Sequence, residues 1–251
     1  MASYLITGCS RGIGLDMVKQ LSARPSSAVA TIFATTRAPT PPQPLADLIQ
    51  ADSKRIHFVQ LDTDDRASIE AAASNIEQQL GQSGLDILVN NAGIAPWESD
   101  PPLGMDSLEQ ALKTNVVGVR DIITAFLQLL RKGQQKKIIN VSSTMGSMAL
   151  AELVASVPRP SYKISKAALN MLTVQYSIYL RDEGFTTVAI SPGWLKTDLG
   201  GKEYADLEVD VGVKATLELI DRLKQEDTGK FLNIHIPGNP TYDGEALYPS
   251  W

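Results

Sequence analysis

A strand-like run at residues 4–7 leads directly into the stretch Thr7-Gly8-Cys9-Ser10-Arg11-Gly12-Ile13-Gly14, which opens a helical pattern at residues 13–23. Glycines permit a tight turn in which backbone N–H groups approach a ligand closely. The N-terminus of a helix also attracts negative charge. A strand, a glycine-rich turn and a helix in this order are typical of pyrophosphate binding in dinucleotide-binding folds. The spacing Gly-x-x-x-Gly-x-Gly differs from the common Gly-x-Gly-x-x-Gly, and alone it also fits a simple strand-to-helix turn.

Beyond this stretch, short apolar and β-branched runs alternate with longer segments of helical periodicity. That alternation is typical of a parallel sheet covered by helices on both faces. The expected strands are residues 4–7, 28–35, 56–61, 87–90, 137–142, 186–191 and 231–234, and the expected helices are residues 13–23, 45–51, 65–80, 106–131, 161–183 and 208–224. We therefore expect one doubly wound α/β domain over residues 1–251, a Rossmann domain with a central seven-stranded parallel sheet flanked by helices.

Composition argues against several classes of function. The 251 residues include 23 Lys and Arg against 28 Asp and Glu, a net charge of -5, which gives no basic footprint for nucleic acid. One cysteine and two histidines allow no internal disulfide and offer no zinc constellation. No apolar run approaches the roughly 18 residues of a membrane span, and the N-terminus does not read as a signal peptide. We expect a cytoplasmic protein that binds no metal, nucleic acid or membrane.

Three further motifs follow the glycine-rich stretch in sequence. They are Asn90-Asn91-Ala92-Gly93 at the end of the fourth expected strand, Tyr162-Lys163-Ile164-Ser165-Lys166 on an expected helix, and Ser191-Pro192-Gly193-Trp194-Leu195-Lys196-Thr197 after the sixth strand. Each motif alone is weak evidence. Together and in this order they resemble the short-chain dehydrogenase/reductase family, from residue 3 to the C-terminus. The resemblance implies an oxidoreductase that uses a nicotinamide dinucleotide and acts on a small carbonyl or alcohol compound.

The resemblance also implies where the cofactor lies. The Asn-Asn-Ala-Gly motif would pack beside the adenosine half, and Asp62 would contact the adenine, although Asp62 is nearly as well explained as a cap for the helix beginning near Asp65. The Pro-Gly turn would approach the nicotinamide, and Thr197 would bond its carboxamide. The expected cofactor-binding residues are Gly8, Ser10, Arg11, Gly12, Ile13, Gly14, Arg37, Asp62, Thr63, Asn91, Ala92, Gly93, Tyr162, Lys166, Pro192, Gly193, Trp194 and Thr197.

The end of the second expected strand indicates which dinucleotide is bound. NAD sites commonly place Asp or Glu there to accept hydrogen bonds from the ribose hydroxyls, whereas this chain has Thr35-Thr36-Arg37. Arg37 can face a 2′-phosphate with its planar fork of donors, and Arg11 offers a second positive charge. The alternative for each arginine is an ordinary solvated surface residue. We expect NADP(H) as the cofactor.

Tyr162 and Lys166 are four residues apart and so project from one face of a helix. A phenol has a pKa near 10, and a nearby ammonium group lowers that pKa toward the neutral range. The resemblance implies that Tyr162 is the general acid in carbonyl reduction. It implies that Lys166 lowers the pKa of Tyr162 and bonds the nicotinamide ribose. The pattern alone also fits an exposed tyrosine–lysine pair on a helix surface.

Two more residues complete the expected catalytic set of Asn115, Ser143, Tyr162 and Lys166. Ser143 ends the fifth expected strand and, by resemblance, would hydrogen-bond the substrate oxygen, with Ser142 as a minor alternative. Asn115 lies among apolar residues in the middle of a long expected helix. Because asparagine is a poor helix-interior residue, we expect a local kink there. The family role would be a carbonyl that holds water in a proton relay toward Lys166; the alternative is a solvated polar side chain.

One feature departs from most of the family. Ser143 and Tyr162 are 19 positions apart, where about 13 is usual, which places roughly six extra residues in the loop at 148–160. That longer loop and the stretch 192–201 are similar to the Sniffer-type (C-factor-like) carbonyl reductases. Apolar residues that could wall a substrate pocket, or equally belong to the core, are Trp97, Met145, Leu150, Trp194, Leu199 and Tyr204.

The favoured activity is NADPH-dependent reduction of a ketone or aldehyde. The alternatives are NADP-dependent oxidation of an alcohol and a non-catalytic NADP-binding regulatory protein. We also expect a homodimer, slightly favoured over a monomer, through the helices that carry Asn115 and Tyr162. The positions that could supply its seam, or face the sheet instead, are Ile122, Phe126, Leu129, Leu172, Tyr176 and Tyr179.

Overall fold

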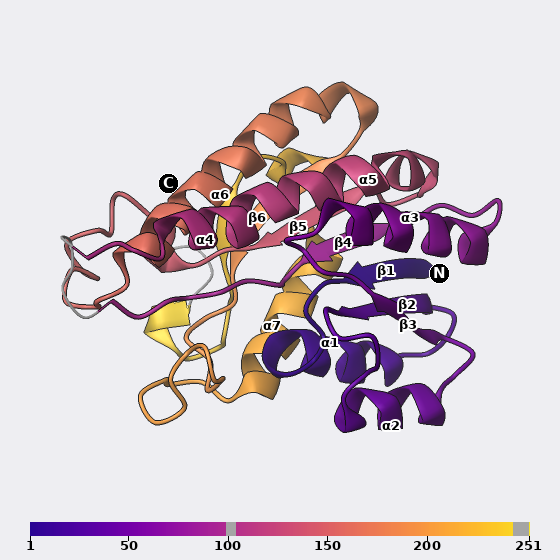
Figure 1. Ribbon diagram of the computed structural model, residues 1–251, viewed down its shortest axis with the longest axis horizontal. Helices are drawn as coiled ribbons and strands as arrows, with labels where there is room; N and C mark the ends of the chain where they lie inside the picture. The colour runs from indigo at the N-terminus through magenta and orange to yellow at the C-terminus, as the bar shows by residue number, and fades with distance from the viewer. Residues whose placement is uncertain (99–103, 243–250) are drawn as a thin grey trace.

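A seven-stranded parallel sheet forms the centre of the computed structural model, which describes residues 1–98, 104–242 and 251 (Figure 1). The strands are β1 Ala2–Ile6, β2 Val29–Thr36, β3 Ile56–Gln60, β4 Ile87–Asn90, β5 Lys137–Val141, β6 Thr186–Ser191 and β7 Phe231–Asn233. Their order across the sheet is β3-β2-β1-β4-β5-β6-β7. The doubly wound α/β prediction is confirmed, and every expected strand is present.

Helices cover both faces of the sheet (Figure 1). They are α1 Gly12–Ser22, α2 Gln43–Ala51, α3 Arg66–Leu80, α4 Leu108–Leu112, α5 Gly118–Lys132, α6 Pro160–Tyr179 and α7 Val209–Arg222. α1, α2 and α7 lie on one face, and α3, α5 and α6 lie on the other. The single long helix expected over 106–131 is interrupted between α4 and α5 by the π-helical turn η1, Lys113–Val117. None of the helices in the described ranges is long and apolar enough to cross a membrane.

The hydrophobic core has two layers, one on each face of the sheet. Along β1, Tyr4 and Ile6 point to the layer beneath α1 and α7, whereas Leu5 points to the layer beneath α3 and α5. Because both faces are covered, all five residues of β1 and all four of β4 are buried. This burial explains why the strands read as continuous apolar runs rather than as alternating patterns.

Helix α5 directs its apolar face toward the sheet. Ile122, Phe126 and Leu129 are buried in the core layer on that face. Of the two interpretations offered for these three residues, the one in which they face the sheet is confirmed, so they are not available to a dimer seam. Leu172 and Tyr176 are partly buried against the same layer, and Tyr179, at the end of α6, is exposed.

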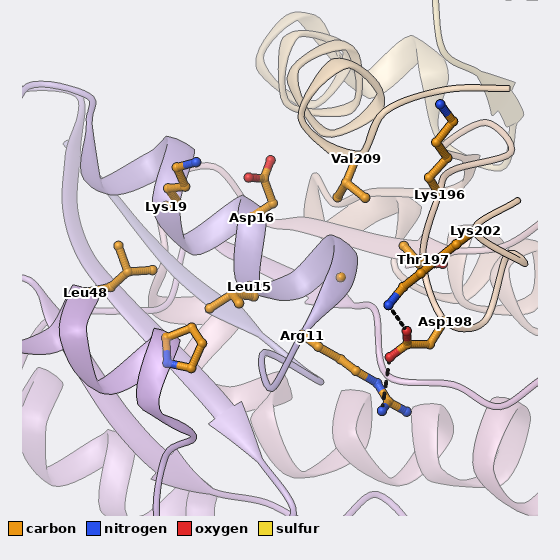
Figure 2. A pocket seen from close by; sticks show the side chains of 12 residues that line it. Arg11, Leu15, Asp16, Lys19, Leu48, Lys196, Thr197, Asp198, Lys202 and Val209 are labelled. Atoms are coloured by element: carbon orange, nitrogen blue, oxygen red, sulfur yellow. Dashed lines mark ion pairs between the residues drawn. The ribbon is translucent and has the colours of Figure 1, made fainter. Parts of the chain in front are cut away.

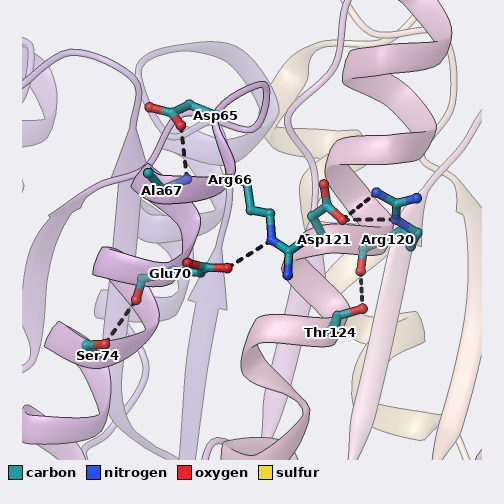
Figure 3. Close-up of polar contacts among 8 residues, drawn as sticks. All are labelled: Asp65, Arg66, Ala67, Glu70, Ser74, Arg120, Asp121 and Thr124. Atoms are coloured by element: carbon teal, nitrogen blue, oxygen red, sulfur yellow. Dashed lines mark hydrogen bonds and ion pairs between the residues drawn. The ribbon is translucent and has the colours of Figure 1, made fainter.

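The start of α3 shows which residue caps that helix, a role that the sequence left open for Asp62. The N-cap of α3 is Asp65, whose carboxylate accepts a hydrogen bond of 3.0 Å from the backbone N–H of Ala67 (Figure 3). The first residue of the helix, Arg66, pairs on the exposed surface with Glu70, one turn further along, at 2.9 Å. Asp62 is therefore not the cap of this helix, and its carboxylate instead accepts the N–H of Asp64 at 3.0 Å.

The strand order places β1 beside β4, the point where the direction of winding reverses. In open α/β sheets, ligands bind in the crevice outside the carboxyl ends of the strands at such a point. The segments that carry the sequence motifs leave the sheet at this edge: the glycine-rich turn after β1, the Asn-Asn-Ala-Gly segment after β4, Ser143 after β5 and the Pro-Gly turn after β6. The topology thus gathers residues that are distant in sequence.

Candidate functional site

The glycine-rich turn is fastened to the segment after β4. The Thr7 hydroxyl accepts the backbone N–H groups of both Asn91 and Ala92 at 3.0 Å, and the Asn91 side-chain amide donates to the Thr7 carbonyl at 2.8 Å. Gly8 has a φ of 72°, and a Cβ there would lie 2.9 Å from the Ala92 Cα. Only glycine meets both the backbone conformation and the close approach.

The N-terminus of α1 is kept open to a ligand. Its N-cap, Arg11, makes no side-chain capping bond, so the first N–H groups of the helix remain available to an anion. A Cβ on Gly14 would contact the Gly8 carbonyl and lie 2.7 Å from the Asn91 side-chain nitrogen. The turn therefore holds a compact shape that fits a pyrophosphate.

The ends of β2 and β3 lie side by side at the same edge of the sheet. Thr36 pairs in register with Gln60, and the Gln60 side chain donates to the Arg37 carbonyl at 3.3 Å. The Arg37 side chain is exposed, and Asp62 follows two residues after β3. Arg37 and Asp62, which are both predicted to contact the cofactor, thus follow neighbouring strands at the same edge of the sheet.

Tyr162 lies in the first turn of α6, facing the end of β5. The side chain is buried, and burial raises the pKa of its phenol above the ordinary value. A hydrogen bond with Ser143 and the charge of Arg159 act in the opposite direction and lower that pKa, without cancelling the effect of burial. The structure therefore brings Tyr162 and Ser143 together. Ser142 instead donates its hydroxyl to Asn170 at 2.5 Å, so Ser143 is the better candidate.

Lys166 stands one turn after Tyr162 and is 4% exposed. Its ammonium donates to the Val141 carbonyl at 2.7 Å, and burial lowers its pKa from 10.5 to about 8. The Lys166 nitrogen lies 5.7 Å from the centroid of the Tyr162 ring. The expected lowering of the Tyr162 pKa by Lys166 is not observed: burial dominates the phenol, and the ammonium is directed at a backbone carbonyl.

Asn115 lies in the π-turn η1 and is fully buried, which rules out the alternative of a solvated side chain. Its carbonyl oxygen accepts the N–H of Ile94, and its amide donates to the Ile94 carbonyl and to the Ser165 hydroxyl, all at 2.9 Å. Ser165 in turn donates to the backbone carbonyl of Tyr162 at 2.8 Å. A Cβ on Gly93 would lie 3.0 Å from the Asn115 oxygen, so glycine permits this close packing.

The turn after β6 approaches the glycine-rich turn from the other side. Gly193 has a φ of 90°, and the following N–H, that of Trp194, donates to the Tyr242 hydroxyl at 3.1 Å. A Cβ on Gly12 would lie 3.3 Å from the Thr197 methyl group, which places Thr197 directly beside the start of α1. The segment expected to contact the nicotinamide therefore lies next to the turn expected to contact the pyrophosphate.

Comparison with known proteins agrees with this geometry. The short chain dehydrogenase family profile matches residues 3–208. The chain belongs to this family. It is similar to Short-chain dehydrogenase/reductase AacuF of Aspergillus aculeatus, with 39% identity over 202 residues that cover 77% of this chain and 74% of that protein.

Two solved structures resemble this family member along nearly their whole length. One is the carbonyl reductase Sniffer of D. melanogaster, with 32% identity, a TM-score of 0.87 and complete coverage of both chains. The other is an NADPH-bound carbonyl reductase from chicken fatty liver, with 36% identity and a TM-score of 0.84 over 93% of this chain and 91% of that one. The resemblance to Sniffer-type carbonyl reductases is confirmed. The protein is thus an oxidoreductase of the short-chain dehydrogenase family.

A carboxylate that the sequence did not single out stands beside the glycine-rich turn of this dehydrogenase. Asp198 pairs with Arg11 at 3.3 Å and with Lys202 at 2.6 Å (Figure 2). The hydrogen bond from Lys202, its charge and that of Arg11 hold the pKa of Asp198 below its usual value. The pairs border a pocket of about 400 Å³ between α1, α2 and the segment after β6. The second positive charge expected from Arg11 is therefore paired with the carboxylate of Asp198.

Several of the apolar residues named as pocket candidates lie on the surface. Trp97, Leu199 and Tyr204 are exposed, which excludes the alternative that they belong to the core. Arg159 connects two of these residues: its guanidinium lies 5.5 Å from the centroid of the Trp97 ring and donates to the Leu199 carbonyl at 2.9 Å. The long loop before α6 exposes Met148 at the same end of the sheet.

Cys9, inside the glycine-rich turn, has a structural environment. Its backbone N–H donates to the Thr35 carbonyl at 2.8 Å, and its thiol donates to the Ile6 carbonyl at 3.2 Å. The side chain is completely buried, which raises the pKa of the thiol to about 12. Cys9 therefore packs as a small side chain, and its raised pKa makes the thiol unreactive.

Proposed function

We propose that this protein is an NADPH-dependent carbonyl reductase that reduces a ketone or aldehyde to an alcohol. The observation that carries the proposal is the cluster of Tyr162, Ser143, Lys166 and Asn115 at the carboxyl ends of the central strands, beside an open helix N-terminus. Carbonyl reductases with 32% and 36% identity share the fold along nearly the whole chain.

The described residues fit an NADP-type dinucleotide. The end of β2 offers Arg37 in place of a carboxylate, so nothing at that position repels a 2′-phosphate. The glycine-rich turn leaves the N–H groups of α1 open to the pyrophosphate. When bound, NADPH supplies the hydride. The chicken relative is described with NADPH bound, which supports the same cofactor here.

In this proposal, Ser143 and Tyr162 hold the substrate oxygen from two sides. Tyr162 donates the proton that the oxygen needs as the alcohol forms. Because burial keeps the pKa of Tyr162 raised, the phenol is protonated at neutral pH, the form that reduction requires. Alcohol oxidation, the reverse reaction, would use the same residues with Tyr162 as the base, and the ratio of the two cofactor forms decides between the two directions.

Lys166 supplies positive charge beneath the reacting groups. With a pKa of about 8, Lys166 carries its positive charge in most molecules at neutral pH, and its N–H groups can bond the nicotinamide ribose. Asn115 and Ser165 fix the helix turn that carries Tyr162. A non-catalytic regulatory protein would have no need for this connected set, so we favour an enzyme. The exposed apolar side chains of Trp97, Leu199 and Tyr204 favour apolar or aromatic carbonyl substrates.

The test is turnover by Tyr162→Phe, followed as NADPH absorbance with a set of aromatic aldehydes and ketones. The change removes one hydroxyl and keeps the ring, so NADPH binding measured by fluorescence should be nearly unchanged. We expect a rate loss of about 100-fold to 10,000-fold, the usual contribution of general acid catalysis. Lys166→Ala should lose both rate and NADPH affinity. Near-normal turnover by Tyr162→Phe would show that Tyr162 is not the acid.

A further inference from the structure

The helix that carries Tyr162 begins without a cap of its own. Its N-cap residue, Arg159, has no side-chain acceptor and makes no capping bond. The next residue, Pro160, has no N–H. The first N–H group at the start of α6 that needs an acceptor is therefore that of Ser161, directly before Tyr162.

Glu98, from the segment after β4, supplies this acceptor. One of its carboxylate oxygens accepts the backbone N–H of Ser161 at 3.1 Å, and the other accepts the Ser161 hydroxyl. Glu98 is only 4% exposed, and within the described ranges it forms no ion pair. Its negative charge instead lies at the positive end of the α6 dipole, where charge-assisted hydrogen bonds are strong.

Two further contacts join the same two segments. The Glu98 N–H donates to the Pro158 carbonyl at 3.0 Å, and the Trp97 ring lies 5.5 Å from the Arg159 guanidinium. Residues 158–161 are therefore held by the backbone N–H and the carboxylate of Glu98 and by the ring of Trp97. The chain before this point, residues 149–158, forms turns and bends, with Leu153 among its exposed side chains. The loop itself contacts α6 through Lys163, whose ammonium donates to the Val154 carbonyl at 2.5 Å. Glu98 is the contact that reaches the N–H at the start of the helix.

The same segment also reaches the other side of the site. Ile94, four residues before Glu98, makes two backbone hydrogen bonds to the Asn115 side chain. The segment 94–98 thus fixes Asn115 at one end and the first turn of α6 at the other. A displacement of that first turn would move the phenol of Tyr162 relative to Ser143.

We propose that Glu98 is a positioning residue, which holds the first turn of α6 so that Tyr162 meets the substrate oxygen. The proposal rests on the proposed function, because it concerns the same proton donor. Displacing a reacting group by about 1 Å costs on the order of 100-fold in rate. Loss of Glu98 should therefore lower turnover while leaving the glycine-rich turn and NADPH affinity unchanged.

The experiment compares Glu98→Gln and Glu98→Ala with the unmodified protein. Turnover of 4-nitrobenzaldehyde, or of another aldehyde that the unmodified protein reduces, is measured per NADPH-occupied site, with occupancy from fluorescence titration. Glutamine keeps one acceptor oxygen, so we expect a loss of about tenfold for Glu98→Gln and about 100-fold for Glu98→Ala. The Kd for NADPH should stay within about twofold of that of the unmodified protein. If Glu98→Ala does not fold, Glu98→Gln alone decides the test.

Asp86→Asn is the matched control. Asp86 is also a buried carboxylate, and it accepts the backbone N–H groups of Ser3 and Gln134 at 2.8 Å, but it precedes β4 at the end of the sheet away from the site. Its amide variant should lower stability and leave turnover per occupied site unchanged. If Glu98→Gln behaves like this control, with full turnover per occupied site, the positioning role is overturned. If instead Tyr162→Phe keeps full turnover, the proposed function itself fails.

Discussion

The buried Lys166 makes a prediction about stability as well as activity. Burial lowers its pKa from 10.5 to about 8, so the folded protein without ligand carries an ammonium in an unfavourable place at neutral pH. At about 1.4 kcal/mol for each tenfold change in the ionisation constant, this burial costs about 3 kcal/mol. Lys166→Met removes the charge and keeps the length of the side chain. It also leaves the Val141 carbonyl without its partner, which costs about 1–2 kcal/mol.

We therefore expect Lys166→Met to be more stable than the unmodified protein by about 1–2 kcal/mol at pH 7, and inactive. The gain should depend on pH. Between pH 8 and pH 10.5 the unfolded lysine keeps its proton while the folded one has lost it, so the stability of the unmodified protein rises with pH in that window. At about pH 9.5 roughly 2 kcal/mol of the penalty is relieved, and the advantage of Lys166→Met should vanish.

The assay is urea unfolding followed by circular dichroism at the two pH values, without cofactor. Lys137→Met is a comparison outside the site: Lys137 is also buried, and burial lowers its pKa, but the charge of Asp221 acts in the opposite direction. Lys137→Met should therefore gain less stability and keep full turnover. A Lys166→Met protein that is less stable at pH 7, or whose advantage is the same at both pH values, would refute the reasoning.

Two further predictions concern the cofactor. Gly14→Ala should lower the free energy of unfolding by about 1–3 kcal/mol or more and weaken NADPH binding, because the new methyl group meets the Gly8 carbonyl and Asn91. Thermal unfolding measures the loss of stability, and fluorescence titration measures the loss of affinity. Arg37→Asp should weaken NADPH binding at least about tenfold and spare NADH, because a charge-assisted hydrogen bond contributes about 1.5–3 kcal/mol. Equal affinity of the unmodified protein for the two cofactors would contradict the role given to Arg37.

Local sequence pattern was sufficient to predict the sheet and much of the site. The strands are continuous apolar runs because both faces of the sheet are covered, and this pattern depends on residues that are neighbours in sequence. The sequence also predicts a local kink at Asn115, since asparagine disfavours the interior of a helix, and the structure has a π-turn there. Tyr162 and Lys166 share a helix face by spacing alone.

Contacts between distant segments could not be predicted in this way. Glu98 lies in a loop without a recognisable motif, and only the folded chain shows that its carboxylate caps α6. Asp198 meets Arg11 because the segment after β6 returns to α1. The direction of the Tyr162 pKa shift depends on how deeply the phenol is buried, which sequence does not reveal. The apolar face of α5 was ambiguous because the pattern does not say which surface covers it.

The buried Cys9 makes the glycine-rich turn observable in solution. It is the only cysteine in the chain, and its thiol is completely enclosed beneath that turn. A thiol-specific reagent can reach it only in molecules whose turn has opened, so the rate of labelling counts opening events. A ligand that binds only the closed turn lowers the fraction of molecules with an open turn, and it slows the labelling of Cys9 by the same factor. The labelling rate of Cys9 therefore reports how often the segment that we assign to the cofactor opens.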